Sequence, residues 1–208
     1  MIPSIFPIAY FGSISYYKKL VETKNPAFEL WETYPRHSIR NHCKILSPNG
    51  VLELIVPLSK PFGSKTRTKD VKIDFTEDWK KKHWRTINSS YASAPFFDYY
   101  GMEIQELLEF ECDNLLEFNL NIHKRICSWL DLYFLVNEKQ SFNLTSEYFP
   151  LKGENEVEKD FRNSFAFQNS ESEYSYQQVF SEKENFISDL SVLDAILNLG
   201  PMARKLLL

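Results

Sequence analysis

The sequence predicts an α+β fold in one domain, with a mixed or antiparallel sheet formed mainly by the N-terminal half and packed by helices from the C-terminal half. The chain has 208 residues, a length at which a single core is usual. Runs with strand composition gather before residue 80, and apolar residues at helical spacing dominate after it. No internal repeat or linker divides the sequence, so we expect one domain over residues 1–208.

The first half is expected to hold one short helix and four strands. Ser13 can cap a helix in which Ile14, Tyr17 and Val21 share one face. Strands are expected at residues 28–31, 43–46, 51–56 and 71–75, which are rich in apolar and β-branched residues. The second and third form a hairpin, because the Ser-Pro-Asn-Gly sequence at 47–50 suits a tight turn.

The second half is expected to be mainly helical. Thr76 begins a helix that ends before Pro95, and two further helices are expected at 102–111 and 115–133. Ser191 with Asp194 resembles a capping box for a last helix at 192–199, which the Gly-Pro pair at 200–201 ends. Residues 142–144 are a further candidate strand, and residues 152–175 receive no assignment.

Composition excludes several classes of protein. Hydrophobic residues make up 43% of the chain, yet no apolar run approaches the length of a membrane span. No basic leader precedes the first apolar residues, so no signal peptide is expected. The three widely spaced cysteines indicate free thiols in a reducing compartment, hence a cytoplasmic protein, and their spacing predicts neither a metal site nor a bound cofactor.

Charge is unevenly distributed along the chain. The overall net charge is −4, but residues 35–72 contain eight basic and two acidic residues, whereas residues 103–171 contain fourteen acidic and six basic ones. This asymmetry predicts a basic face that attracts an anionic small molecule.

The densest basic motif runs from Arg36 to Lys44. If it is extended, Arg40, His42 and Lys44 project from one face, as clamping a phosphate or carboxylate would require, and Asn41 lies beside them. The alternative is a solvated strand edge whose cations discourage aggregation.

Two other segments contain candidate residues. His83 shares a helical stripe with Trp79 and Ile87, so it is either a core imidazole or an acid/base group. In the second segment, Gln178 could bind a sugar or amide. Asp194 is a candidate base, but an acidic residue in the first turn of a helix also has a structural explanation, since it stabilises the helix dipole.

Five segments, taken in order, resemble the WbqC-like family of bacterial proteins, in the form common in Bacteroidetes. They are PIAYFGSISYY (7–17), SIRNHCKI (38–45), PNGVLELIVPL (48–58), DVKIDFTEDWKKKHWRTINSSYASAPFFDYY (70–100) and YQQVFSEKENFISDLSVLDAILNLGP (176–201). The chain departs from the family pattern at Ile39 and His42 and in LKGENEVEKDF (151–161), which implies a changed or lost ligand.

The resemblance implies a link to surface polysaccharide (O-antigen) biosynthesis, and we expect a transferase acting on a nucleotide-activated sugar. In this hypothesis Arg40, Asn41, His42 and Lys44 bind the phosphates, and Tyr91 or Gln178 contacts the sugar. His83 is the acid/base group, oriented by Asp74 or Asp194.

Two alternatives remain open at this point. The chain could be a non-catalytic accessory protein that binds an anionic metabolite or a protein partner through its basic face. Nucleic-acid binding is disfavoured, because the chain is acidic overall and lacks a recognised motif. The residues leave the substrate and the oligomeric state open.

Overall fold

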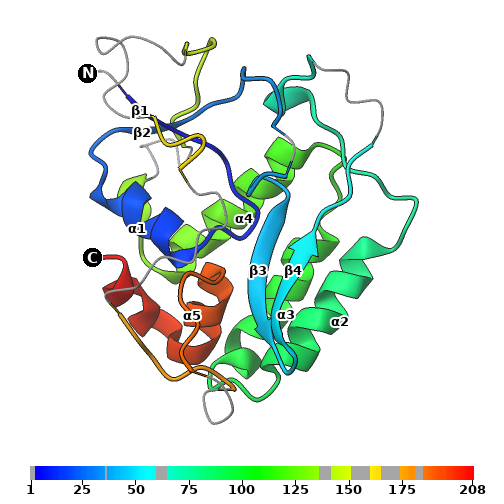
Figure 1. Ribbon diagram of the computed structural model, residues 1–208, viewed down its shortest axis with the longest axis vertical. Helices are drawn as coiled ribbons and strands as arrows, with labels where there is room; N and C mark the ends of the chain where they lie inside the picture. The colour runs from blue at the N-terminus through cyan, green and yellow to red at the C-terminus, as the bar shows by residue number, and fades with distance from the viewer. Residues whose placement is uncertain are drawn as a thin grey trace.

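The computed structural model describes residues 3–35, 37–59, 65–135, 142–150, 160–164, 174–180 and 185–208. The strands are β1 (Ser4–Phe6), β2 (Pro26–Phe28), β3 (His42–Ser47) and β4 (Gly50–Ile55). The α-helices are α1 (Ile14–Glu22), α2 (Trp79–Tyr91), α3 (Phe97–Glu109), α4 (Leu115–Trp129) and α5 (Val192–Leu199), shown in Figure 1. Short 3-10 helices are η1 (Thr68–Asp70), η2 (Tyr133–Leu135) and η3 (Gly200–Leu206).

The fold is α+β, as the sequence predicts, but the strands form two small sheets and not one. β1 pairs with β2 in parallel, and β3 pairs with β4 antiparallel. The first sheet is extended by single bridges from Ile5 to Asp160 and from Phe28 to Leu144. The strand expected at 71–75 is reduced to isolated bridges, Leu58 to Ile73 and Lys72 to Asn114, so it never joins the hairpin as a full strand.

The hairpin forms where the sequence places it. Ser47 pairs with Gly50, whose φ of 96° is a left-handed value that glycine adopts without strain. The Ser47 hydroxyl donates to the Gly50 carbonyl and accepts from the Asn49 amide, which closes the turn. Cys43, Ile45 and Leu54 are buried, so one face of this hairpin packs on the core.

Several helices begin or end at residues other than those predicted. α2 begins at Trp79 because the Asp78 carboxylate caps it by accepting from the Lys81 amide, whereas the amide of the predicted cap, Thr76, donates to Asp74. α3 begins at residue 97 and α4 ends at residue 129, while α5 coincides with its predicted range. β2 begins two residues before the strand expected at 28–31 and overlaps it at Phe28.

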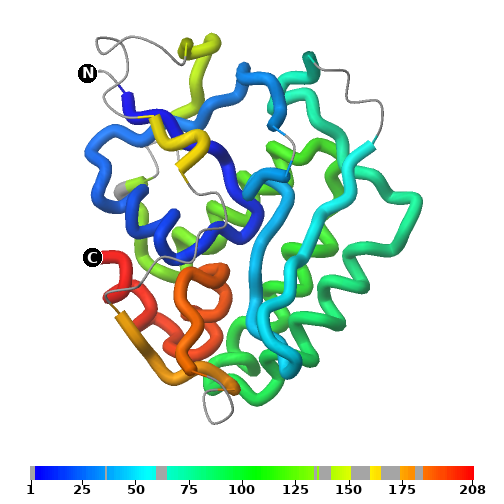
Figure 2. Tube along the Cα trace, viewed as in Figure 1, coloured from blue at the N-terminus to red at the C-terminus, as the bar shows by residue number. Residues whose placement is uncertain are grey.

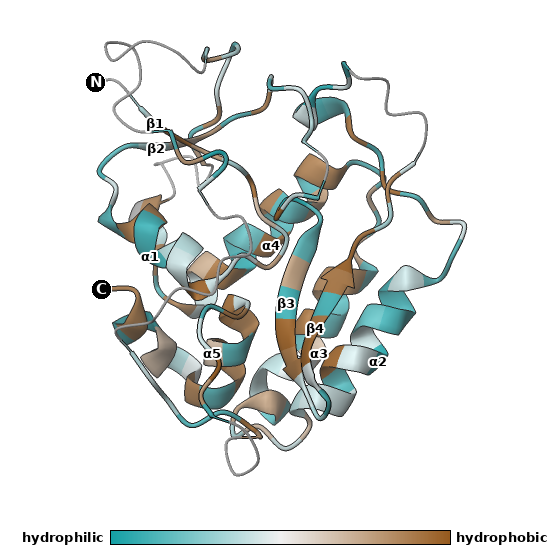
Figure 3. Cartoon of the chain, viewed as in Figure 1, coloured by the Kyte–Doolittle hydropathy of each residue, from teal (hydrophilic) through white to brown (hydrophobic). Residues whose placement is uncertain are grey.

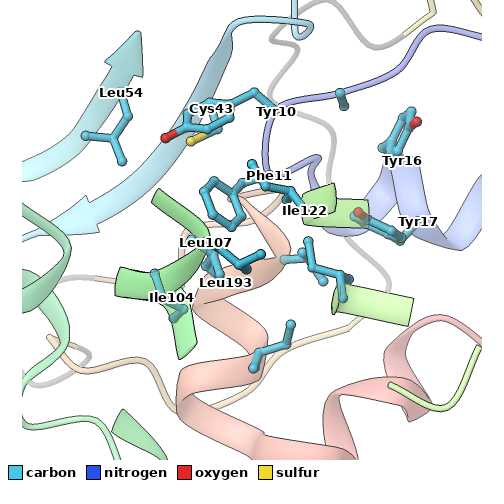
Figure 4. Packing of buried hydrophobic residues seen from close by; sticks show 14 of the residues in the cluster. Tyr10, Phe11, Tyr16, Tyr17, Cys43, Leu54, Ile104, Leu107, Ile122 and Leu193 are labelled. Atoms are coloured by element: carbon cyan, nitrogen blue, oxygen red, sulfur yellow. The ribbon is translucent and has the colours of Figure 1, made fainter. Parts of the chain in front are cut away.

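One hydrophobic core joins the hairpin to all five α-helices. Figure 4 shows Phe11 beside side chains of α3, α4 and α5, including Leu107, Ile122 and Leu193. α5 is apolar almost all round, as its colouring in Figure 3 shows, and Val192, Leu193 and Ile196 are at most 1% exposed. Burying each such side chain contributes about 1.5–3 kcal/mol, so α5 is a central packing element. None of the helices in the described part of the chain is both long and apolar enough to cross a bilayer.

Candidate functional site

A cavity of about 290 Å³ lies where three distant segments of the chain meet. The first is the loop before α1, the second is β3 with Ile39 of the turn before it and Val51 of its partner strand β4, and the third is the loop before α5. Its walls are Phe11, Gly12, Ser13, Ile39, His42, Cys43, Lys44, Val51, Ile187, Ser188, Asp189, Leu190 and Ser191. The sequence-predicted residues His42 and Lys44 both line it.

The caps of two helices hold the cavity together. Ser13 caps α1 and Ser191 caps α5, and these two residues form an antiparallel bridge with each other. The Ile14 amide donates to the Leu190 carbonyl (3.1 Å), and the Val192 amide donates to the Gly12 carbonyl (2.9 Å). Each helix therefore begins against the loop that precedes the other helix. In Figure 2 the two chain segments, about 180 residues apart in sequence, run side by side.

β3 is joined to the same structure. The Ser191 amide donates to the Lys44 carbonyl (2.8 Å), and the Ser191 hydroxyl donates to the Phe11 carbonyl (2.8 Å). Ser191 thus contacts the other two segments of the wall by hydrogen bonds. The cavity is a hydrogen-bonded junction of the fold and not a gap between loosely packed loops.

Two residues of the wall have strained backbones. Phe11 has φ of 40° and Asp189 has φ of 54°, left-handed values that are costly for residues with a side chain. Such conformations cost about 1–3 kcal/mol each and concentrate at binding and active sites, where the surrounding structure holds them. Here the buried Phe11 ring and a bond from the Ser15 amide to the Asp189 carboxylate (3.0 Å) hold them.

The charged groups of the cavity are arranged around β3. The His42 Nδ1 lies 3.1 Å from the Glu53 Oε1 on the paired strand β4. Lys44 is half-buried, and Asp189 places one carboxylate on the opposite wall. The first amides of both helices already have acceptors within the protein, so an anion here would be bound by side chains and not by a free helix N-terminus.

Behind the cavity, three predicted site residues meet at one buried carboxylate. Asp194 is 0% exposed and accepts hydrogen bonds from the Tyr91 hydroxyl (2.9 Å), the Tyr176 hydroxyl (2.6 Å) and the Gln178 side-chain amide (3.0 Å). Tyr91 also accepts from the Leu46 amide of β3 (3.1 Å). We call Asp194, Tyr91, Tyr176 and Gln178 the Asp194 cluster.

Ser191 and Asp194 do not form the capping box expected from the sequence, because the Asp194 carboxylate does not accept from the Ser191 amide. That carboxylate is bound by the two hydroxyls and the amide, while the Ser191 amide donates elsewhere, to Lys44. Burial raises the pKa of Asp194, and the three hydrogen bonds offset only part of that rise. Burial and the neighbouring Asp194 carboxylate raise the pKa of Tyr91 and Tyr176 as well, so both hydroxyls remain donors.

Gln178 connects the Asp194 cluster to the cavity wall. Its side-chain amide donates to the Ile187 carbonyl (2.9 Å), and its carbonyl accepts from the Ile187 amide (3.0 Å). Ile187 is the first wall residue of the loop before α5. The Asp194 carboxylate therefore holds the Gln178 side chain in place by a hydrogen bond, and Gln178 in turn holds the loop before α5 through Ile187.

Arg40 and Asn41 belong to the framework and do not line the cavity. Arg40 lies in a turn before β3, is 2% exposed, and forms an ion pair with Glu32 and a hydrogen bond to Ser38 (2.7 Å). The Asn41 amide donates to the Val56 carbonyl (3.0 Å), and its oxygen accepts from Tyr34 (2.7 Å). The single extended face expected for Arg40, His42 and Lys44 therefore holds only for the last two.

His83 and Asp74 also lie apart from the cavity. The His83 Nδ1 bonds to the Tyr10 hydroxyl (2.8 Å) beside Trp79, and burial lowers its pKa to about 4. Asp74 accepts from the Thr76 amide (2.8 Å). Within the described residues, Asp74 forms no hydrogen bond or ion pair with His83. His83 thus has the environment of the core imidazole that the sequence offered as one of two interpretations.

Several residues of this site were not singled out as site residues from the sequence. Ser13 and Ser191 were recognised as caps, but nothing in the sequence shows that the caps pair. Glu53, Asp189 and Ser188 were not selected, because each becomes notable only when distant segments meet. The described residues contain no group of three or more His, Cys, Asp or Glu side chains that could hold a metal ion.

Comparison with known proteins identifies the family. The sequence profile of the WbqC-like protein family matches residues 8–158, most of the chain, so the chain belongs to that family. The matched region contains the first two segments of the cavity wall, and residues 187–191 lie beyond it.

The chain is also similar to the uncharacterized protein Rv1507c of Mycobacterium tuberculosis, with 28% identity over 100 residues. That alignment covers 48% of this chain and 43% of the relative, so the chain spans less than half of the relative's length. No solved structure matches the chain.

Proposed function

We propose that the chain binds an anionic, sugar-containing metabolite in the cavity between the caps of α1 and α5. The observation that carries this proposal is the meeting of three segments around one cavity that contains His42 and Lys44. Segments 7–17 and 38–45 fall almost wholly within the family match, and segment 176–201 carries only the resemblance noted in the sequence. The strained backbone of Phe11 and Asp189 supports it, since strain of this kind is typical of functional sites.

The ligand class follows from the walls. Lys44 supplies a cation for a phosphate or carboxylate, and Ile39, Val51 and Leu190 supply apolar surface for the face of a sugar ring. The volume of about 290 Å³ is at the lower end for ligand sites, so the cavity would enclose one end of the ligand and leave the rest outside.

The finer form of the proposal is a cytoplasmic transferase that uses a nucleotide-activated sugar in surface polysaccharide biosynthesis. The family resemblance supports the pathway, and three free cysteines support the compartment. For proton transfer we favour His42 over His83, because His42 lies in the cavity wall and a carboxylate lies close enough to orient its ring. Asp194 acts here as a positioning residue, through Gln178.

A thermal-shift screen tests the binding site. Nucleotide sugars, sugar phosphates and plain nucleotides are added to the wild type, to Lys44→Ala and to Lys82→Ala, an exposed lysine of α2 that serves as the matched control. A ligand at one hundred times its Kd stabilises by about 2.7 kcal/mol, or about 5–10 °C for a chain of this size. We expect the shift in the wild type and in Lys82→Ala, and its loss in Lys44→Ala.

An unchanged shift in Lys44→Ala would refute the assignment of this cavity. A transferase assay on the compound that binds then separates an enzyme from an accessory protein. His42→Gln is expected to lower turnover by about 100-fold or more while binding is retained, because general acid/base groups contribute about 10²–10⁴-fold. Absence of turnover by the wild type with every bound compound would favour the accessory protein.

A further inference from the structure

A second and larger cavity has a volume of about 580 Å³. The backbone of its lining residues 31–35 lies at the end of the molecule away from α5 (Figure 2). It shares no wall residue with the first cavity. Its walls come from residues 31–35 and 65–67 and from Tyr148, Arg162 and Asn163. Its volume is within the range of small-molecule sites.

Two paired segments form one wall of this cavity. Thr33 and Arg67 form an antiparallel bridge, the Tyr34 amide donates to the Thr66 carbonyl (2.9 Å), and the Thr68 amide donates to the Glu32 carbonyl (3.0 Å). This pairing places the indole of Trp31 beside cations of the facing segment. The Arg67 guanidinium carbon is 5.1 Å and the Lys69 Nζ 3.6 Å from its ring centroid.

Two of the three cations in the wall of this cavity, Lys65 and Arg67, are not paired with an acid among the residues that the structure describes, whereas Arg162 is paired with Asp160 and Glu29. Within the described residues, the side chains of Lys65 and Arg67 have no ion-pair or hydrogen-bond partner. Glu32, the acidic residue of the wall, is already paired with Arg40. Both cations are exposed and available to an incoming anion.

Aromatic rings form the rest of the recognition surface. The Trp31 indole N–H donates to the Thr145 carbonyl (3.0 Å), which fixes the ring. Tyr148 is 44% exposed, and the Arg162 guanidinium carbon lies 5.6 Å from its ring centroid. Arg162 is itself immobilised by Asp160 and by the Phe149 carbonyl (2.9 Å), so the guanidinium acts as a fixed support for that ring.

We propose that this second cavity binds a nucleoside di- or triphosphate. Arg67 and Lys65 bind the phosphate groups, for which a guanidinium offers paired N–H donors. The base stacks on the ring of Tyr148, as bases do on exposed aromatic side chains. The site is independent of the metabolite site proposed above and either can exist without the other.

Calorimetric titration of the full chain with adenosine and uridine diphosphates, inorganic pyrophosphate and the two nucleosides tests this inference. We expect the diphosphates to bind at least tenfold more tightly than pyrophosphate or the nucleosides, because each of the latter satisfies only half of the site. Arg67→Ala and Lys65→Ala each weaken diphosphate binding by about tenfold or more. Tyr148→Ala weakens diphosphate binding and leaves pyrophosphate binding unchanged.

Two control variants show whether the diphosphates bind in this cavity or elsewhere on the protein. Lys72→Ala removes an exposed lysine that pairs with Asp113 and lies outside both cavities, so it should bind as the wild type does. Lys44→Ala removes a cation of the first cavity, so its comparison with Arg67→Ala shows in which of the two cavities the diphosphates bind. Equal binding of pyrophosphate and nucleoside diphosphate, no binding of either diphosphate, or loss of binding in Lys44→Ala but not in Arg67→Ala would overturn the assignment.

Discussion

The molecule buries carboxylates in two different ways at its two ends. Near β2, Glu29 and Glu32 are paired with the arginines Arg162 and Arg40. Behind the first cavity, Asp194 is surrounded by neutral donors, two tyrosine hydroxyls and one amide. The first arrangement neutralises its charges and the second leaves one charge uncompensated.

The difference shows what each end of the molecule does. The Glu29–Arg162 pair connects segments that are far apart in sequence, and the Glu32–Arg40 pair closes a turn. Glu29 also accepts from the Trp31 amide, the Thr145 hydroxyl and the Phe149 amide, so this region functions as a clamp for the fold. The Asp194 cluster holds one loop of a cavity through neutral hydrogen bonds. We therefore expect changes in the first region to affect stability, and changes in the second to affect ligand binding as well.

Arg40→Met is expected to have the largest effect on stability. It leaves Glu32 buried without its partner, which costs about 3–5 kcal/mol. Urea unfolding followed by circular dichroism measures this loss. In the double variant Arg40→Met, Glu32→Leu most of the stability should return, because a hydrophobic pair replaces the ion pair at little net cost. A double variant as unstable as the single one would show that the pair does not act as a clamp.

Asp194→Asn is expected to cost less, about 1–3 kcal/mol. The asparagine amide cannot accept from all three donors, so at least one buried hydrogen bond is lost. The same unfolding experiment measures it, with Tyr176→Phe as a milder companion that removes one hydroxyl. A cost as large as that of Arg40→Met would contradict the comparison between the two ends.

The pH dependence of stability should differ in sign between two single carboxylates, Asp194 and Asp160, the latter paired with Arg162. Burial raises the pKa of Asp194 above 3.8, so its folded form binds the proton more tightly, and its contribution to stability falls as pH rises above about 3.8. For Asp160 burial opposes ionisation, but hydrogen bonds and charge from Arg162 outweigh it and lower the pKa. Its contribution is present above 3.8 and is lost as pH falls through the lowered value.

Unfolding of Asp194→Asn and Asp160→Asn between pH 3.5 and 7, a range chosen to span the ordinary carboxyl pKa, makes this comparison. The deficit of Asp194→Asn relative to the wild type should shrink with rising pH, and that of Asp160→Asn should grow. Each unit of pKa difference corresponds to about 1.4 kcal/mol. If the stability deficits of the two variants changed with pH in the same direction, Asp194 and Asp160 would not differ in the way proposed.

Gln178→Ala is expected to have the smallest effect on stability, about 1–2 kcal/mol. Asp194 loses one of its three donors, but water can replace the bonds to the half-buried Ile187. The effect of the substitution on the loop should be larger. Hydrogen exchange of residues 187–191 should accelerate, while exchange in α2 stays as in the wild type. Unchanged exchange in the loop would mean that Gln178 does not position it.

Local signals in the sequence predict the local structure well. The turn at 47–50 and the caps Ser13 and Ser191 depend on neighbours a few residues away, and the hairpin, α1 and α5 form as predicted. Parallel pairing of β1 with β2 and the bridge between the two caps depend on contacts between distant segments, and no local pattern encodes them.

The same limit applies to the candidate site. His42 and Lys44 could be selected because the basic motif is visible in the sequence, and they do line the cavity. Arg40 belongs to the same motif, but its buried position was hidden because its partner Glu32 is eight residues away, across a turn. For Asp194 the sequence offers a catalytic role and a first-turn role side by side and does not show the hydrogen-bonded cluster, since its three donors come from other parts of the chain.

Hydrogen exchange with and without the compound that gives the largest thermal shift tests whether the segments around the caps of α1 and α5 form a ligand site. We predict that the compound slows exchange at residues 11–15, 42–46 and 187–193, and that Lys44→Ala abolishes this protection. Protection confined to other parts of the chain, with these three segments unchanged, would contradict a ligand site there.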